Sequence, residues 1–116
     1  MWNIIELRKD NDLTQYQISL YLNINRRSYG NIEKGKRKLN IEECIKLALL
    51  YDVSIEYIYG LTDDKSIRLH IDKHKRKDII MSYNIDINYY NKLRNIIIEH
   101  EKRLEFSREI TKSKIT

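Results

Sequence analysis

The sequence has no proline, a single cysteine and no long apolar run. Cys44, the one cysteine, cannot form a disulfide within the chain. No apolar run approaches the roughly 20 residues that a membrane-spanning helix needs. The first residues also lack the charged, apolar and small-residue segments of a signal peptide. We therefore expect a reducing, cytoplasmic setting and no membrane partner.

The sequence also lacks the residue patterns of common catalytic sites. It shows no paired carboxylates, no nucleophile with a neighbouring base and no glycine-rich loop that could cradle a phosphate. His70 and His74 lie close in sequence with Asp72 between them, but no third metal ligand accompanies them. At 116 residues the chain suits one compact domain with an appendage. We expect no enzyme activity, no bound cofactor and no metal site.

Positive charge is concentrated in one short segment. The whole chain has 22 Lys+Arg against 17 Asp+Glu, a net charge of +5. Residues 26–38 hold six basic side chains and one acidic one, whereas residues 1–60 as a whole are nearly balanced. Such a cluster favours a polyanionic partner, and a solvated loop is the alternative.

The first 60 residues predict a small bundle of short helices. Apolar residues recur at three-residue and four-residue spacing, without the sustained alternation that strands show. Thr14 and Gln17 form a capping box, Asn23 favours a sharp turn, and Gly35 is placed to end a helix. The expected helices cover residues 3–10, 15–22, 26–34, 41–51 and 55–61. Asn25, Asn40 and Ser54 cap the last three of these helices. In the fourth helix we expect five buried residues: Ile41, Cys44, Ile45, Ala48 and Leu49.

The second half of the chain gives weaker signals. We expect residues 63–84 to be a linker, with a possible short strand at 67–71 and a solvated basic run at 72–77. Residues 85–116 predict one longer helix, which Asp86 can cap. An apolar stripe on this helix must be buried, and we expect a second copy of the chain to cover it as a dimer interface. In the dimer, the interface residues would be Tyr90, Leu93, Ile97 and Leu104. The alternatives are that the helix forms a lid over the fourth and fifth helices of the same chain, or that a different protein covers the stripe.

The helices at 15–22 and 26–34 have the residues of a helix-turn-helix motif. Ser19 is small where the second helix crosses the first, and Asn23 suits the tight turn between them. Apolar residues at positions 18, 22, 24, 29 and 32 fix both helices against the bundle. A plain helical hairpin would not need the polar residues to be arranged in this way.

Seven further stretches of the N-terminal half belong to the same pattern: Leu7-Arg8, Leu13-Thr14-Gln15, Leu22-Asn23-Ile24, Ile32-Glu33-Lys34-Gly35, Leu47-Ala48, Val53-Ser54 and Gly60-Leu61-Thr62-Asp63. With them, about residues 4–62, half of the chain, resemble the Cro/repressor-type (Xre-like) DNA-binding domain, a five-helix lambda-repressor-like fold. Ser19 replaces the usual alanine of that family, Asn23 replaces the usual glycine, and Leu39 replaces a frequent proline. The resemblance implies an all-α fold with the helix-turn-helix domain over 1–62, and the weaker signals after it predict the linker over 63–84 and the helical extension over 85–116.

The resemblance also implies how such a domain would meet DNA. The helix after Asn25 would lie in the major groove with its N-terminal residues over base edges, where the planar fork of arginine matches guanine O6 and N7. It further implies a largely buried ion pair between Arg8 and Glu33. We predict base contacts by Arg26, Arg27, Ser28 and Asn31, and phosphate contacts by Gln15, Lys34, Lys36, Arg37 and Lys38.

The function expected from the sequence is a transcription regulator that binds double-stranded DNA. The family suggests a repressor of phage or mobile-element type that occludes a promoter as a homodimer on a palindromic operator. The alternative is a protein-interaction module, such as an antitoxin or developmental regulator, whose C-terminal helix binds a partner. The residues after Asp64 are too few for a self-cleaving peptidase domain, so control by a regulatory protein, a peptide or proteolysis stays open.

Overall fold

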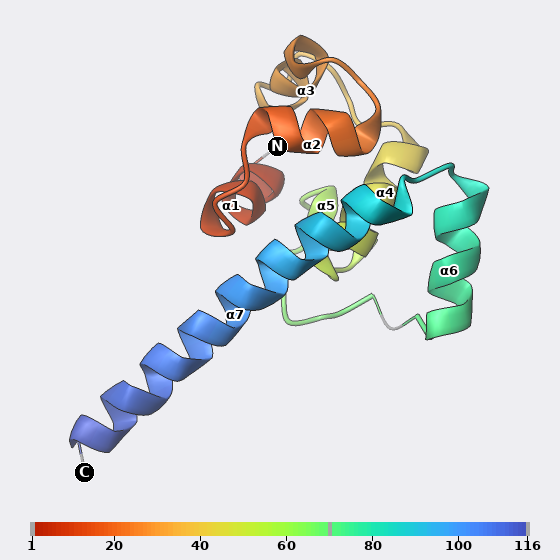
Figure 1. Ribbon diagram of the computed structural model, residues 1–116. Helices are drawn as coiled ribbons and strands as arrows, with labels where there is room; N and C mark the ends of the chain where they lie inside the picture. Colours follow the sequence, from red (N-terminus) through yellow and green to blue (C-terminus); the bar gives the residue numbers. More distant parts are fainter. Residues whose placement is uncertain (1, 70, 116) are drawn as a thin grey trace.

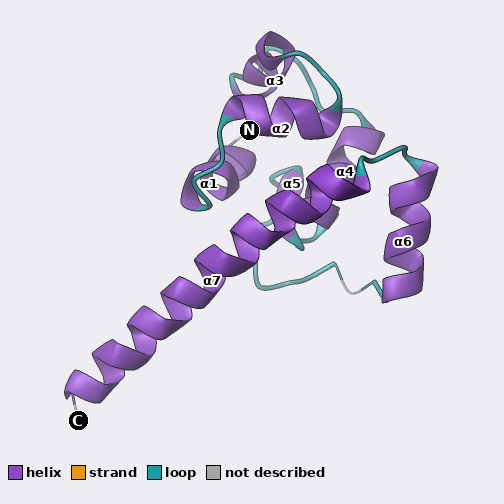
Figure 2. Cartoon of the chain, in the orientation of Figure 1, coloured by secondary structure: helices purple, strands orange, loops and turns teal. Residues whose placement is uncertain are grey.

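The computed structural model describes the backbone of residues 2–69 and 71–115 and the side chains of residues 3–69 and 71–109. Within these ranges the chain forms seven helices and no strand (Figures 1 and 2). The all-α class that the sequence predicts is confirmed. The helices are α1 (Trp2–Asp10), α2 (Gln15–Leu22), α3 (Arg26–Glu33), α4 (Ile41–Tyr51), α5 (Ile55–Ile58), α6 (Lys73–Ser82) and α7 (Ile87–Ile115).

The predicted caps set the boundaries of the N-terminal helices. The Thr14 hydroxyl accepts from the Gln17 N–H at 3.1 Å, and the Gln17 side chain accepts from the Thr14 N–H at 2.8 Å. Asn25, Asn40 and Ser54 cap α3, α4 and α5 in the same manner, each accepting from the third backbone N–H. These caps are local, so the sequence alone was enough to locate them.

Helices α1 to α5 and parts of α6 and α7 share one hydrophobic core. Cys44, Ala48 and Leu49 of α4 are fully buried there, as predicted. Ile41 is 62 % exposed, so its predicted burial is wrong. It is the first residue of α4, beside the exposed cap Asn40, and it faces solvent.

The predicted linker over 63–84 contains a helix, α6, and residues 67–69 and 71 form no strand. The basic run at its start is solvated, as predicted, because Lys73, Lys75 and Lys77 are exposed. Asp72 caps α6 by accepting from the Lys75 N–H at 2.8 Å. Ile80 of α6 is 4 % exposed and belongs to the core. The sequence did not predict α6 because its first residues are basic, and the buried apolar residue Ile80 comes only near the end of the helix.

Helix α7 packs against α4 of the same chain along its first turns (Figure 1). Tyr90, Leu93 and Ile97 are 5 %, 0 % and 1 % exposed, so they are core residues. The expectation that they form a dimer interface is therefore wrong for these three. The intramolecular alternative accounts for them, and Leu104, at 50 % exposure, is the one interface candidate left on the surface.

Arginines of the second half bind the C-terminal end of α4. Arg94 of α7 donates to the Leu50 carbonyl at 2.7 Å. Arg76 of α6 donates to the Leu49 carbonyl at 3.2 Å and lies 3.4 Å from the carboxylate of Asp52, the C-cap of α4. Cations stabilise the negative end of a helix dipole and satisfy carbonyls that lack helical partners. These contacts tie residues 63–97 to the N-terminal domain.

None of the described helices is both long and apolar enough to cross a membrane. His70 lies outside the described residues, and among those described no three His, Cys, Asp or Glu side chains are grouped so that they could hold a metal ion.

Candidate nucleic-acid interface

A tight turn joins α2 to α3 and sets the angle between them. Asn23 adopts the left-handed conformation with φ of 58°, and the Ile24 N–H donates to the Ser19 carbonyl at 3.0 Å. Ser19 is 1 % exposed, as expected for a small residue beneath a crossing helix. The predicted turn at Asn23 is confirmed.

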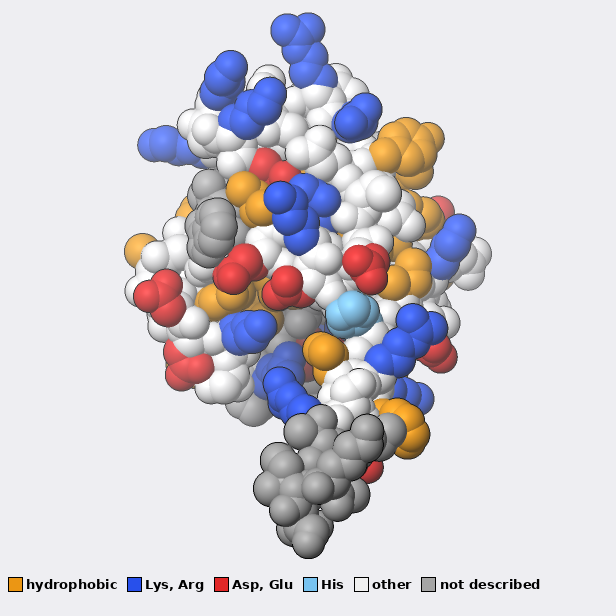
Figure 3. All heavy atoms as spheres, turned by 90° about the vertical axis from the view of Figure 1, so that its left-hand side faces the viewer, with side chains coloured by type: hydrophobic (Ala, Val, Ile, Leu, Met, Phe, Trp, Pro, Cys, Tyr) orange, Lys and Arg blue, Asp and Glu red, His pale blue; other side chains and the backbone are white. Residues whose placement is uncertain are grey.

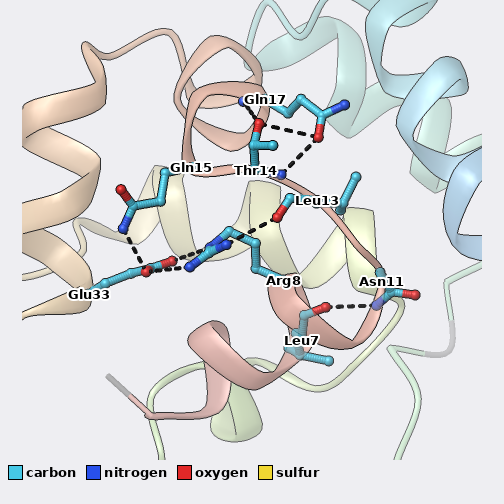
Figure 4. A network of polar contacts seen from close by, with 8 residues as sticks. All are labelled: Leu7, Arg8, Asn11, Leu13, Thr14, Gln15, Gln17 and Glu33. Carbon is cyan, nitrogen blue, oxygen red and sulfur yellow. Dashed lines mark hydrogen bonds and ion pairs between the residues drawn. The ribbon is translucent and has the colours of Figure 1, made fainter.

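A polar network ties α1 and the start of α2 to the end of α3 (Figure 4). Arg8 donates to Glu33 through Nε at 2.7 Å and through Nη2 at 3.0 Å, a bidentate pair. Their side chains are only 11 % and 6 % exposed, so the expected ion pair is confirmed. Gln15 Nε2 adds a third bond to Glu33, at 3.0 Å. The network fixes α3 relative to the rest of the domain.

This network alters the ionisation of Glu33. Burial alone would raise the pKa of this carboxyl group, but the hydrogen bonds from Arg8 and Gln15 oppose burial, and its pKa is lowered. The hydrogen bonds to Glu33 in turn raise the pKa of Arg8 above its usual range. Both groups are therefore charged in the folded protein at neutral pH.

Acid should weaken the fold through Glu33. Because its folded pKa lies below the unfolded value of about 4.3, the carboxylate contributes stability that is complete above about pH 5. That contribution is lost as the pH falls through the folded pKa. We expect Glu33→Gln to remove this part of the pH dependence, measured as the free energy of urea unfolding between pH 3 and 7. An unchanged acid limb in the variant would contradict this assignment.

The N-terminal end of α3 presents two free cations. Arg26 and Arg27, its first two residues, are exposed, and neither forms an ion pair with a described residue. Cations are unfavourable at this positive end of a helix dipole, typically by 0.3–1 kcal/mol each. Their position therefore costs stability, and an external partner explains it better than folding does.

Ser28 and Asn31 are half-buried on α3. The Ser28 N–H is used by the Asn25 cap, at 2.7 Å, while the Asn31 carbonyl accepts from the N–H groups of Lys36 and Arg37 at 2.8 and 3.2 Å. These bonds involve the backbones of Ser28 and Asn31. Their side chains are partly open to solvent on the same helix as the two arginines, and their base contacts stay predictions.

The loop after α3 carries the remaining predicted cations. Gly35 has φ of 78°, a conformation that suits glycine, and it lets the chain turn at the end of α3. Lys34, Lys36 and Lys38 are exposed around this turn, and none forms an ion pair with a described residue. Three exposed ammonium groups after the C-terminal end of α3 suit the contacts with phosphate groups that the sequence predicts.

Two of the predicted phosphate contacts have partners inside the chain. Arg37 forms a bidentate pair with Glu43 of α4, at 3.0 and 2.9 Å, and Gln15 is bound to Glu33. The sequence analysis missed both bonds. The capping box of Asn40 and Glu43 offered a signal, since it holds Glu43 beside the loop. Arg37 thus anchors the loop, and its phosphate contact stays a prediction.

Lys and Arg side chains gather at the end of the molecule that α3 occupies, whereas most Asp and Glu side chains on the same face lie further from that end (Figure 3). The cation-rich end is built from the exposed start of α3 and the following loop. Two short helices joined by the tight turn at Asn23, with α3 held by a buried ion pair and unpaired cations at its exposed start, are the features of a helix-turn-helix domain.

Comparison with known proteins agrees with this class. Residues 4–58 match the family described as "Helix-turn-helix", so this segment belongs to that family. Over 59 residues the chain is 44% identical to a protein of Bacillus subtilis (strain 168) named "Uncharacterized HTH-type transcriptional regulator YobD". The similar region covers 51% of this chain and 53% of the relative, so the chain spans about half the length of this curated relative. No solved structure matches the chain significantly.

Proposed function

We propose that the protein is a transcription regulator that binds a specific sequence of double-stranded DNA through α3. The observation that carries the proposal is the pair of free arginines, Arg26 and Arg27, at the exposed start of a helix held by the Arg8 and Glu33 network. Arginine can bind guanine O6 and N7 through two parallel bonds in the major groove. Such a bidentate contact discriminates against the wrong base by about 1–3 kcal/mol.

The remaining cations supply affinity without choosing a sequence. Lys34, Lys36 and Lys38 would neutralise phosphates on the strand that follows the groove, with Ser28 and Asn31 available to nearby bases or sugars. Neutralised phosphates release counterions, so binding should weaken steeply as the salt concentration rises. Such a regulator would act in the cytoplasm, where bacterial DNA lies.

The finer form of the proposal is a repressor that binds a palindromic operator as a homodimer and occludes a promoter. Two recognition helices about 34 Å apart can read two half-sites one turn of DNA apart. This form rests on the domain class and on the exposed residues 101–109 of α7, which a dimer would cover. A regulatory protein or peptide that acts on α7 would then control repression, and no catalytic step is needed.

A second candidate function is a protein-interaction module in which DNA binding is secondary. The exposure of residues 101–109 of α7, including Leu104 and Phe106, favours it. Light scattering on the purified full chain separates the two candidates, because a monomer that dimerises only with a different protein supports this module and a homodimer supports the regulator.

Selection of bound duplexes from a random DNA library tests the proposed function. We expect a palindromic consensus whose half-sites contain at least one guanine that depends on Arg26 or Arg27. The spacing of the half-sites reports the distance between the two α3 helices in the dimer. A pool that stays random after repeated rounds, at a salt concentration where the protein still binds, would overturn sequence-specific binding.

The division of labour between arginines and lysines gives a sharper prediction. Arg26→Ala should relax base preference at one position and cost about 1–3 kcal/mol on the consensus site, with little loss on random DNA. Lys36→Ala should weaken all sequences alike and reduce the slope of log affinity against log salt by about one. Lys77→Ala, at an exposed cation of α6, is the matched control and should change neither. Equal losses of Arg26→Ala and Lys36→Ala on every sequence would contradict the proposed roles.

A further inference from the structure

The second half of α7 extends away from the body of the molecule (Figure 1). Residues 101–109 are all exposed, in contrast to Tyr90, Leu93 and Ile97, which lie in the core. A helical segment of this length is only marginally stable in water unless another surface packs against it. The exposed segment therefore needs a covering surface that the chain itself does not supply within its described residues.

Leu104 marks the side of α7 on which that surface would lie. It follows Leu93 and Ile97 at spacings that keep all three on one face of the helix. Leu93 and Ile97 are buried in the core, whereas Leu104 is 50 % exposed. The exposed apolar position thus continues the intramolecular interface along the same helix.

A cleft of about 510 Å³ runs beside this part of α7. Its apolar lining residues include Leu7 of α1, Val53 and Ile97. Charged side chains of both signs line it in equal number: Asp10, Glu101, Glu105, Lys65, Arg68 and Arg108. None of these six forms an ion pair with a described residue. An occupant should therefore be amphipathic and should carry both signs of charge as well.

The charges on α7 are arranged so that the helix complements itself. Glu101 lies one turn before Leu104 and Arg108 one turn after it, on the same side of the helix. A two-fold axis perpendicular to α7 near Leu104 would bring Glu101 of each copy opposite Arg108 of the other, in two equivalent pairs. A two-fold interface has this reciprocal form, because residue i contacts j and j contacts i.

We propose that the cleft beside Leu104 is filled by α7 of a second copy of this chain, which runs antiparallel to the first. The two Leu104 side chains pack together near the axis, and each Arg108 lies between the Glu101 and Glu105 carboxylates of the opposite copy. Lys65 and Arg68, which also line the cleft, supply positive charge near the Glu101 and Glu105 carboxylates of the second copy. Charged residues that flank an apolar helix seam set the choice and the direction of the partner helix.

This arrangement leaves the cation-rich end free for DNA. Figure 1 places α3 at one end of the molecule and the far half of the α7 backbone at the other. The inference rests on the proposed function in one respect: the role of the dimer would be to present two α3 helices to one duplex. Its test needs no DNA, so a failure of the interface and a failure of DNA recognition are distinguishable.

Sedimentation velocity on the full chain, without DNA and over a range of protein concentrations, tests the interface. Leu104→Ala should raise the dimer dissociation constant about tenfold or more, because both copies lose a buried side chain. Phe106→Ala is the matched control, since Phe106 is also exposed, at 65 %, but lies on the opposite face of α7. It should leave the dissociation constant unchanged.

A charge swap tests the direction of the two helices. Glu101→Arg or Arg108→Glu alone should weaken the dimer about tenfold, because each places like charges opposite one another. The double variant should restore the affinity, with circular dichroism confirming that every variant folds. A monomeric wild type, greater sensitivity to Phe106→Ala than to Leu104→Ala, or a double variant no tighter than the single ones would each overturn the proposal. Selection of a consensus by the wild type in any of these cases would leave DNA recognition standing.

Discussion

Replacement of Arg8 by alanine is expected to lower the free energy of unfolding by about 3–5 kcal/mol, a large part of the stability of a small domain. Glu33 would lose both bonds from the guanidinium group, and the 6 % exposure of its side chain leaves little access to water. Gln15 would remain its one neutral donor from the network. The loss comes mainly from the buried charge left without its partner, and urea unfolding followed by circular dichroism at pH 7 measures it.

Arg26→Ala serves as the control for Arg8→Ala. Arg26 is exposed at the positive end of α3 and forms no ion pair with a described residue, so its removal should raise stability slightly, by no more than about 1 kcal/mol. The two variants should therefore separate folding from recognition, since Arg26→Ala changes base preference and Arg8→Ala changes stability. A loss below about 1 kcal/mol for Arg8→Ala would contradict the role given to the buried pair.

Replacing both partners extends this test. The double variant Arg8→Met with Glu33→Leu removes the charges and keeps apolar volume in their place, so it should recover much of the stability lost in Arg8→Ala. The pair would then serve mainly to fix the orientation of α3. In that case the double variant should fold but bind its consensus less selectively than the wild type.

The N-terminal half was predictable because its signals are local. The capping residues Thr14, Asn25 and Asn40, and the left-handed turn at Asn23, act on residues within one helical turn, so sequence spacing is enough to identify them. The Arg8 and Glu33 pair joins distant residues and was expected only through the family resemblance. The pair of Arg37 and Glu43 had no such guide and was missed.

The second half shows why apolar patterns leave the partner surface undecided. A stripe on α7 indicates that one face is buried, but it does not identify the surface that covers it. For the first turns of α7 the covering surface is α4 of the same chain, because Arg76 and Arg94 donate to the Leu49 and Leu50 carbonyls at the end of α4. Helix α6 was overlooked for a related reason. Its first turn is rich in cations, which disfavour a helix start, and its stability comes from distant contacts of Arg76 and Ile80.

At the DNA-binding surface, the sequence identified the segment and its charge. It could not show that Gln15 and Arg37 have partners within the chain, because those bonds depend on how α2, α3 and α4 meet. The free cations that remain, Arg26 and Arg27 on α3 and the lysines after it, are the residues on which the predicted contacts now depend.

Replacement of Leu93 by alanine is expected to cost about 2–5 kcal/mol of stability, the usual range for a leucine deleted from a core. Leu93 is completely buried where α7 meets α4, and the cavity left behind cannot close easily between two packed helices. Urea unfolding should show this loss at every protein concentration, because the contact lies within one chain. Leu104→Ala is the matched control, since it removes the same atoms from a half-exposed position farther along the same helix. At concentrations where the chain is monomeric it should cost less than about 0.5 kcal/mol. If the cost of Leu93→Ala depended on protein concentration, the first turns of α7 would contact a second copy, as the sequence first suggested. If it does not, the start of α7 belongs to the fold, and its exposed residues 101–109 are the part available to a partner.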